Sequence, residues 1–265
     1  MSKKIVAIGG GENGRVKSDG TKLPYETREI DEEIINLTNK KNPNFLFLAH
    51  AQIEEIDEES YFATMKKIYE DLFGCKCSII KKKELKANIE KAIELVTWAD
   101  IIYEGGGDTK GMMELWIETG FDKVLIDAWK NGKVLCGVSA GANCWFKSCS
   151  SDSLKIQLKD ETAPLINVNG LNLVNAFFTP HCNIKNEFND RLGHMKESIK
   201  GKDLVGIGIS NCCALEIIDD EYRLIKSEIS AYGIKAFWDN GDYIEEKIDS
   251  SKEYKKLNEF LQSGW

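Results

Sequence analysis

The sequence predicts an α/β protein with a doubly wound, mostly parallel sheet flanked by helices. Three observations predict this fold class: short apolar runs alternate with longer helical patterns in the first half, glycine-rich turns follow several of these runs, and no compositionally biased linker interrupts the chain. Apolar strands that alternate with helices are typical of parallel sheets with right-handed crossovers. With 265 residues, of which 42% are hydrophobic, we expect one domain over residues 1–265.

The first half of the chain supplies the expected parallel strands and the helices that join them. The strands are predicted at residues 4–8, 44–49, 76–81, 100–104 and 133–138. The helices are predicted near residues 26–40, 57–73, 84–98 and 112–131. In the second of these helices, apolar residues recur at spacings of three and four, which gives the helix one apolar face.

After His181 the pattern changes to shorter runs that are separated by turn residues. A helix is expected at residues 187–200, strands at 204–210, 214–218, 222–226 and 234–238, and a last helix at 251–262. Asp219-Asp220 and Asn240-Gly241-Asp242 are typical of hairpin turns. We therefore expect this half to extend the same sheet with antiparallel strands.

Composition and charge exclude several function classes. The formal charge of −8 would repel nucleic acid, and Lys81-Lys82-Lys83 is interpreted as the solvated start of a helix. The first ten residues hold too few apolar side chains for a signal peptide, and no run approaches the ~20 apolar residues that span a bilayer. We expect a cytoplasmic protein that does not bind membranes.

The eight cysteines are expected to be free thiols, because the cytoplasm keeps them reduced. Cys75 and Cys77, and the adjacent Cys212 and Cys213, lack the paired spacing of a zinc site. No metal and no cofactor are predicted.

The segment Gly137-Val138-Ser139-Ala140-Gly141 lies between an expected strand and an expected helix. A G-x-S-x-G turn in this setting places a serine hydroxyl at a sharp elbow beside a helix N-terminus, where an oxyanion can be stabilised. Ser139 is therefore the candidate nucleophile. The alternative interpretation is a turn of small residues that packs a helix against a strand.

A serine nucleophile needs a base, and the chain has three histidines. His181 follows an apolar run and Pro180, at the carboxyl end of an expected strand where open sheets build their sites. His50 also ends a strand and is the rival candidate, whereas His194 is expected on the surface of a helix. Any of the three could instead have a purely structural role.

The third member of a triad orients the imidazole ring. Asp152, Asp160 and Glu161 are the candidates between Ser139 and His181. Asp152 lies in the small polar stretch just after the elbow helix, and on spacing alone a turn or N-cap aspartate is an equal alternative.

The glycine run Gly105-Gly106-Gly107 follows the expected strand at 100–104 and precedes a helix. Such a run can cradle a phosphate or present backbone N–H groups to an oxyanion. Lys110 is not at the position that a phosphate-binding loop requires, and Gly9-Gly10-Gly11 lacks the dinucleotide pattern. With Ser139 on the next strand, we expect Gly106 and Gly107 to contribute to an oxyanion hole.

Three motifs together resemble the dipeptidase E family of serine peptidases, peptidase family S51, which also includes cyanophycinases. They are the glycine run with Asp108-Thr109, the segment from Cys136 to Asn143 around the serine, and Thr179-Pro180-His181. The similarity covers roughly residues 1–245. It implies a fold like that of the class I glutamine amidotransferases, with serine in place of the elbow cysteine, and cleavage of peptides beside an aspartyl residue.

The resemblance also implies roles for single residues. Ser139 is the implied nucleophile, His181 the base and Asp152 the acidic partner. Arg191 lies about where family members hold a substrate carboxylate, although a salt bridge on the helix surface is an equal alternative. Asp108 and Thr109 are implied to contact substrate, and Asp108 departs from the asparagine that is more usual in the family.

The predicted mechanism is acyl transfer to Ser139 with His181 as base and Asp152 as its orienting partner, acting on short peptides without a cofactor. The amides of Gly106, Gly107 and Ala140 are expected to bind the oxyanion. One alternative is another amidase, an esterase or a cyanophycin-degrading enzyme on the same site. The other is a binding protein that keeps the fold without turnover. Formation of a homodimer is left open.

Overall fold

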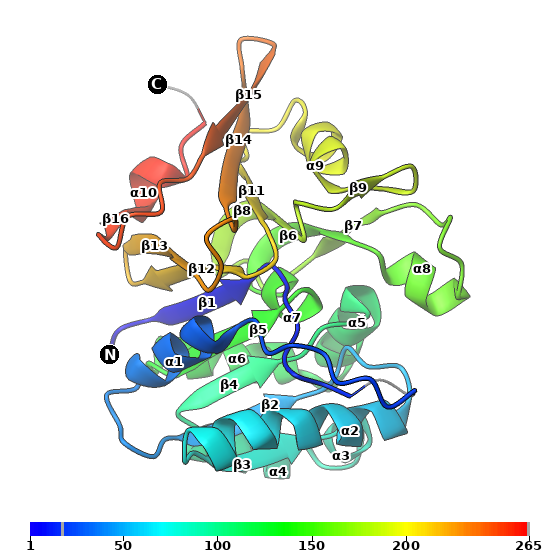
Figure 1. The fold of residues 1–265 in the computed structure, drawn as a ribbon, viewed down its shortest axis with the longest axis vertical. Coiled ribbons are helices and arrows are strands. Elements are labelled where there is room, and N and C mark those ends of the chain that lie inside the picture. The colour runs from blue at the N-terminus through cyan, green and yellow to red at the C-terminus, as the bar shows by residue number, and fades with distance from the viewer. Residues whose placement is uncertain (17–18, 264–265) are drawn as a thin grey trace.

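The computed structural model describes residues 1–16 and 19–263. Its strands form an eight-stranded sheet and a six-stranded sheet, together with a small hairpin. In Figure 1 the larger sheet occupies the lower part of the molecule and the smaller one the upper part. The mixed α/β architecture confirms the predicted fold class. The prediction that residues 1–265 make one domain stays a prediction.

The larger sheet has a parallel half and an antiparallel half. The parallel strands, in spatial order, are β1 (Lys4–Ile8), β5 (Val134–Val138), β4 (Ile101–Glu104), β2 (Asn44–Leu48) and β3 (Lys76–Ile80). On the other side of β1, antiparallel strands continue the sheet: β12 (Cys213–Ile218), β13 (Glu221–Lys226) and β16 (Lys255–Lys256). Strand β1 therefore lies at the centre, with its carboxyl end beside that of β5.

Helices cover both faces of the parallel half, because successive side chains of a strand point to opposite faces. Val6 and Ile8 of β1 pack in one core cluster with α1 (Arg28–Asn36), α2 (Glu55–Lys66) and the π-helix η1 (Lys67–Leu72). Ile5 and Ala7 pack on the other face with α3 (Lys82–Ala87), α4 (Ile89–Trp98), α5 (Thr109–Thr119) and α6 (Phe121–Lys130). This arrangement is the doubly wound pattern that the sequence predicts.

Two helices that the sequence predicts as continuous are each broken in the structure. The helix predicted at 84–98 is divided at Asn88, whose extended backbone and side chain cap α4 by accepting a hydrogen bond from the Lys91 amide. The helix predicted at 112–131 is divided at Gly120, which adopts the left-handed conformation with φ of 75°. Both breaks use residue types that commonly end or begin helices.

The second half of the chain differs from the prediction that it only extends the first sheet. Residues 213–226 do so, but six strands form a second sheet in the order β15 (Asp242–Lys247), β14 (Gly233–Asp239), β11 (Gly206–Ile209), β8 (Val174–Pro180), β6 (Phe146–Ser151) and β7 (Ile166–Asn169). The physical reason is that alternation in a strand sets which side chains are buried but not which strand it pairs with. Both predicted hairpin turns are present, with positive φ at Asp219, Asn240 and Gly241.

The remaining elements are short. They are α7 (Ala140–Asn143), α8 (Ser153–Leu158), the hairpin of β9 (Lys185–Asn186) and β10 (Asn189–Asp190), α9 (Arg191–Ile199) and α10 (Leu257–Phe260). The helix predicted at 187–200 thus starts later, because the hairpin uses its first residues. The helix predicted at 251–262 is one turn long and follows β16.

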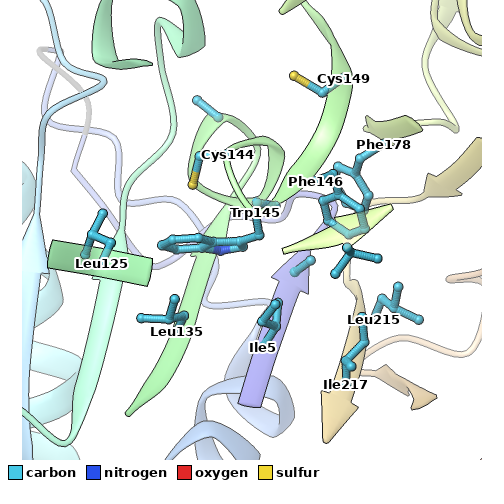
Figure 2. Packing of buried hydrophobic residues seen from close by; sticks show 14 of the residues in the cluster. Ile5, Leu125, Leu135, Cys144, Trp145, Phe146, Cys149, Phe178, Leu215 and Ile217 are labelled. Atoms are coloured by element: carbon cyan, nitrogen blue, oxygen red, sulfur yellow. The ribbon is translucent and has the colours of Figure 1, made fainter. Parts of the chain in front are cut away.

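One apolar cluster joins the two sheets (Figure 2). It includes Ile5 and Leu135 of the larger sheet together with Phe146 and Phe178 of the smaller one, whose rings stack with centroids 4.3 Å apart. Each such fully buried side chain contributes about 1.5–3 kcal/mol to stability. The shared core fixes the carboxyl ends of strands from both sheets relative to one another. Among residues 1–16 and 19–263, no helix has the length and apolar character needed to cross a membrane.

Candidate active site

The elbow around Ser139 forms as the sequence predicts, at the end of β5. Ser139 has φ of 56° and ψ of −110°, and its amide donates a hydrogen bond of 3.0 Å to the carbonyl of Ile8. A Cβ atom at Gly141 would lie 2.0 Å from the Glu104 carbonyl oxygen, and one at Gly137 would lie 2.6 Å from the same atom. Both glycines are therefore required for the close approach of the elbow to β4. The helix that follows, α7, is only one turn long.

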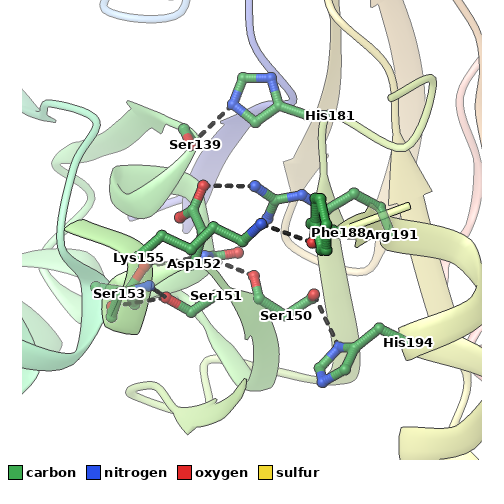
Figure 3. A network of polar contacts seen from close by, with 12 residues as sticks. Ser139, Ser150, Ser151, Asp152, Ser153, Lys155, His181, Phe188, Arg191 and His194 are labelled. Atoms are coloured by element: carbon green, nitrogen blue, oxygen red, sulfur yellow. Dashed lines mark hydrogen bonds and ion pairs between the residues drawn. The ribbon is translucent and has the colours of Figure 1, made fainter. Parts of the chain in front are cut away.

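The structure brings His181 to Ser139 from the other sheet. His181 directly follows β8, with φ of 53°, and its Nε2 lies 2.9 Å from Ser139 Oγ (Figure 3). The His181 amide donates a hydrogen bond of 2.9 Å to the carbonyl of Gly9, the residue after β1. The carboxyl end of β1 thus fixes the backbone of both Ser139 and His181, through the carbonyls of Ile8 and Gly9.

The other ring nitrogen of His181 contacts a residue that the sequence analysis missed. Nδ1 lies 2.6 Å from Oδ1 of Asn211, which follows β11, the strand that pairs in parallel with β8. One sequence signal could have identified Asn211: it is a polar residue that directly follows the strand predicted at 204–210, where open sheets build their sites. It was overlooked because only carboxylates between Ser139 and His181 were considered.

Asp152 does not occupy the position that the sequence analysis predicted for it. Its Oδ2 lies 2.6 Å from Nη2 of Arg191, the first residue of α9 (Figure 3). The residue next to His181 Nδ1 is instead Asn211. Arg191 is only 2% exposed, so the ion pair is buried on its cationic side. The reason for the difference is the second sheet, on which α9 packs and which thereby brings Arg191 to Asp152. Arg191 Nε has no hydrogen-bond partner among the described residues.

The surroundings of His181, and above all its burial, favour its neutral form. Burial lowers the pKa of His181 from its ordinary value, and the positive charge of Arg191 lowers it further. The negative charges of Asp152 and Glu12 oppose this shift. A neutral imidazole can accept a proton from the Ser139 hydroxyl, which is the state that a general base needs.

The side chains of Asp108 and Thr109 are buried and form hydrogen bonds within the protein. Asp108 caps α5 by accepting a hydrogen bond from the Gly111 amide, and its second oxygen accepts one of 2.8 Å from Gln157 Nε2. Thr109 Oγ1 accepts a hydrogen bond of 3.0 Å from Asn143 of α7 and is 1% exposed. These contacts do not support the substrate-binding roles that were expected for the two residues, because both side chains are buried and engaged.

The glycine loop lies beside Ser139. A Cβ atom at Gly106 would be 3.5 Å from the Ser139 Cβ. The Gly106 amide faces the Tyr61 hydroxyl at 3.5 Å, and the Gly106 carbonyl accepts a hydrogen bond from Gln52 Nε2. The amides on either side, those of Gly105 and Asp108, donate to carbonyls of Leu48 and Ala51. No hydrogen bond joins the Gly107 amide to another residue within the described part of the chain.

The other histidines lie away from Ser139. His50 is 2% exposed, its Nδ1 accepts a hydrogen bond of 2.9 Å from Trp116 Nε1, and burial lowers its pKa to about 3. His194 is half-buried rather than on the surface, and its Nδ1 lies 2.9 Å from Ser150 Oγ. The rival acids Asp160 and Glu161 are exposed in the turn after α8. Of the three histidines, His181 is therefore the one that contacts the candidate nucleophile.

The side chains of the described residues do not form a metal site. No group of three or more His, Cys, Asp or Glu side chains in residues 1–16 and 19–263 is arranged to hold an ion. The eight cysteines are unpaired thiols, and all but Cys77 are buried. Lys110, near the glycine loop, pairs with Glu114 of its own helix at 2.6 Å.

Known proteins are similar to this chain in sequence and in fold. Residues 5–225 match the model of "Peptidase family S51". The chain is 30% identical over 236 residues to "Uncharacterized peptidase YgaJ" of Bacillus subtilis (strain 168), which covers 89% of this chain and 91% of that protein. The crystal structure of a peptidase from an acI-B1 Actinobacterium has the same fold, with a TM-score of 0.69 at 21% identity over 97% of both chains. The region that matches the family model, residues 5–225, includes Ser139, His181 and Asn211.

Proposed function

Because the chain belongs to peptidase family S51, we propose that it is a serine-type peptidase that hydrolyses short peptides, with Ser139 as the nucleophile and His181 as the general base. The observation that carries the proposal is the contact of 2.9 Å between Ser139 Oγ and His181 Nε2 at a strained strand-to-helix elbow. A nucleophile within hydrogen-bond reach of a base is the arrangement that activates a hydroxyl at neutral pH.

The proposed reaction proceeds through an acyl-enzyme. Ser139 Oγ attacks the carbonyl carbon of the scissile bond while its proton passes to His181 Nε2. His181 then gives this proton to the leaving amine, and the carbon–nitrogen bond breaks. A water molecule, deprotonated by the same nitrogen, then attacks the carbonyl carbon of the ester. The bond from this carbon to Ser139 Oγ breaks, His181 returns the proton to Oγ, and the second product leaves. The pKa of His181 lies below its ordinary value, which keeps the ring ready to accept the proton near neutral pH.

We propose that the amides of Gly107 and Ala140 form the oxyanion hole. The Gly106 amide was also expected there, but it is directed at the Tyr61 hydroxyl. In a trans peptide the carbonyl and the following N–H point to opposite sides. Because the Gly106 carbonyl is bound by Gln52, the Gly107 N–H points away from Gln52. Ala140, at the first position of α7, has an amide with no acceptor inside its own helix.

Replacement of Gln52 by alanine is expected to lower kcat by about 10- to 100-fold, with little change in KM. The variant leaves the peptide between Gly106 and Gly107 free to rotate, and one misdirected oxyanion donor costs on the order of 10²-fold in kcat. Steady-state kinetics on one dipeptide would measure the effect. Gln157→Ala is the control, since it removes a part-buried hydrogen bond to Asp108 and leaves the contact of Gln52 with the Gly106 carbonyl in place. Equal losses in the two variants would contradict a specific role of Gln52.

The substrate preference follows from the Asp152–Arg191 pair. The resemblance to dipeptidase E implies cleavage beside aspartyl residues, with Arg191 holding the side-chain carboxylate. In this chain Arg191 is 2% exposed and its charge is matched by Asp152 at 2.6 Å. A substrate carboxylate would have to compete with Asp152, which already occupies Nη2 of the guanidinium. We therefore propose broad activity on short peptides with a weak preference for aspartate.

The purified protein is expected to hydrolyse short peptides and to react with a fluorophosphonate at Ser139. Free dipeptides of the Asp-X, Ala-X and Lys-X types, a matched ester and a cyanophycin peptide would be compared by kcat/KM. We expect the Asp-X and Ala-X values to agree within about tenfold, or about 1.4 kcal/mol, because an aspartyl side chain would gain the guanidinium at the expense of its existing pair with Asp152. Mass spectrometry would locate the label.

The control for this experiment is His181→Ala, which should neither turn over nor be labelled, beside Ser60→Ala on the exposed face of α2. Turnover of the ester alone would indicate an esterase instead of a peptidase. A wild-type protein that neither hydrolyses any substrate nor takes the label would favour the binding protein without turnover.

A further inference from the structure

We propose that Glu104, held as a neutral carboxylic acid, is a positioning residue that fixes the glycine loop beside Ser139. The assignment rests on the proposed function, in which the Gly107 amide binds the oxyanion. Glu104 is the last residue of β4, and its side chain is completely buried. The proposal is based on a series of contacts that leads from its carboxyl group, through the segment after β2, to the glycine loop.

The side chain of Glu104 connects β4 to the segment after β2. Its Oε1 accepts a hydrogen bond of 3.1 Å from the Ala51 amide. The Ala51 carbonyl in turn accepts one of 2.8 Å from the Asp108 amide, at the end of the glycine loop. A Cβ atom at Gly107 would lie 2.3 Å from the same carbonyl oxygen, so the loop packs directly on Ala51. The carboxyl group therefore fixes the peptide against which Gly107 lies.

The backbone of Glu104 lies against the elbow. Its carbonyl oxygen would be 2.0 Å from a Cβ atom at Gly141, and Glu104 is the register partner of Gly137 in β5. One residue thus contacts the elbow through its main chain and the support of the glycine loop through its side chain. Such a residue can hold the nucleophile and the oxyanion donor at a set separation, which catalysis requires.

His50 does not supply a positive charge to Glu104. The His50 Nδ1 atom lies 3.8 Å from Glu104 Oε2, which is beyond hydrogen-bond reach. This nitrogen instead accepts the hydrogen bond of 2.9 Å from Trp116 Nε1, an atom that can only donate. A ring nitrogen that accepts a hydrogen bond carries no proton, so the imidazole is neutral. Glu104 Oε2 has no hydrogen-bond partner among the described residues.

The other ionisable groups near Glu104 also fail to balance a negative charge on it. Glu58 of α2 is itself an acid, and the Lys82 Nζ atom lies 3.5 Å from its Oε1. Burial raises the pKa of Tyr61 to about 12 and that of Cys144 well above its ordinary value, so both are neutral. Burial likewise raises the pKa of Glu104, nearby backbone amides oppose this shift, and the charge of Glu58 adds to it. The neutral acid is therefore the favoured form.

A neutral buried acid gives the protein a characteristic pH dependence. The pKa of Glu104 is higher in the folded than in the unfolded protein, so its contribution to stability is complete below the unfolded value of about 4.3. The contribution is lost as the pH rises toward the folded value. Glu104→Gln does not titrate. We therefore expect its unfolding equilibrium constant, relative to that of the wild type, to fall about tenfold per pH unit between about pH 5 and 7.

Glu216→Gln is the matched control, because Glu216 is a second fully buried glutamate in the same sheet. Its Oε1 accepts a hydrogen bond of 2.9 Å from Arg223 Nε, so its charge is paired. Loss of this pair should raise the unfolding equilibrium constant about tenfold or more near neutral pH. The kcat of this variant should stay within about threefold of the wild type, since β1 and β5 separate β12 from β4.

Kinetics on one dipeptide test the positioning role separately from stability. Glu104→Leu fills the same buried space but leaves the Ala51 amide without its acceptor. We expect kcat to fall about 10- to 100-fold with less than about a threefold change in KM, because an oxyanion donor is displaced. Glu104→Gln keeps an acceptor oxygen and should recover most of this loss. Equal losses in the two variants, or none in Glu104→Leu, would overturn the positioning role.

Two further measurements need no substrate. The infrared difference between the wild type and Glu104→Gln near neutral pH should contain the carbonyl stretch of a carboxylic acid, and a carboxylate band in its place would overturn the neutral state. Hydrogen exchange of the Asp108 amide should be about tenfold faster in Glu104→Leu, and unchanged exchange would overturn the link to the loop. If the protein hydrolyses no peptide, the proposed function fails, whereas these two measurements still decide the role of Glu104.

Discussion

Ser139→Gly is expected to abolish peptidase activity and yet to yield a more stable protein than Ser139→Ala. Both variants remove the nucleophile and should lose on the order of 10⁴- to 10⁶-fold in kcat. They differ in the backbone, because Ser139 has φ of 56° and ψ of −110°. This conformation is strained for a residue with a Cβ atom, whereas its mirror image lies in the broad β region and is open to glycine.

The size of the difference follows from two opposing terms. Strain at a sparsely populated φ/ψ pair costs roughly 1–3 kcal/mol, and glycine relieves it. The greater freedom of glycine in the unfolded chain offsets about 0.5–1 kcal/mol of this gain. We therefore expect Ser139→Gly to exceed Ser139→Ala by about 1 kcal/mol in the free energy of unfolding, measured by urea denaturation.

Each outcome has a clear meaning. An alanine variant as stable as the glycine variant would show that the elbow stores no strain. Residual activity above about 10⁻³ of the wild type in either variant would place the nucleophile elsewhere. The expected result means that the fold gives up stability at Ser139 to expose its hydroxyl, a trade-off that is common at functional sites.

The elbow and its base could be predicted from sequence because their signals are local. Gly137 and Gly141 bracket Ser139 between a strand and a helix, and Pro180-His181 follows an apolar run. The parallel half of the larger sheet was predictable for the same reason, since each strand is followed by its own helix. Period and turn residues are properties of short windows, and no long-range pairing has to be known to read them.

The partner of His181 could not be predicted, because it depends on pairing between distant segments. Asn211 is 30 residues from His181, and the two meet because β8 and β11 are neighbours in the second sheet. The same sheet carries α9 and brings Arg191 to Asp152, which removes Asp152 from the triad position. Which strands pair is set by the packing of the whole chain. The contact of Asn211 with His181 therefore could not be predicted from local sequence patterns.

Gly141→Ala is expected to destabilise the protein by at least about 3 kcal/mol and to lower kcat/KM by 10²-fold or more. The added Cβ atom would lie 2.0 Å from the Glu104 carbonyl oxygen and 2.9 Å from that of Gly105. Both are backbone atoms, so no side chain can rotate away to relieve the clash, and overpacking of this kind costs several kcal/mol. Denaturation with urea and kinetics on one dipeptide would measure the two effects.

The effect on catalysis has its own physical reason. Relief of the clash requires the elbow to move away from β4, and the glycine loop with Gly107 follows β4 directly. The nucleophile and the proposed oxyanion donor would therefore separate, and a displacement of about 1 Å at a reacting centre costs on the order of 10²-fold. Gly106→Ala is the matched folding control, because its Cβ would make an ordinary contact of 3.5 Å with Ser139 and should change stability by less than about 1 kcal/mol. If Gly141→Ala proved as stable as this control, the elbow would have to be free to move relative to β4, and the rigid placement of Ser139 against the glycine loop would be wrong.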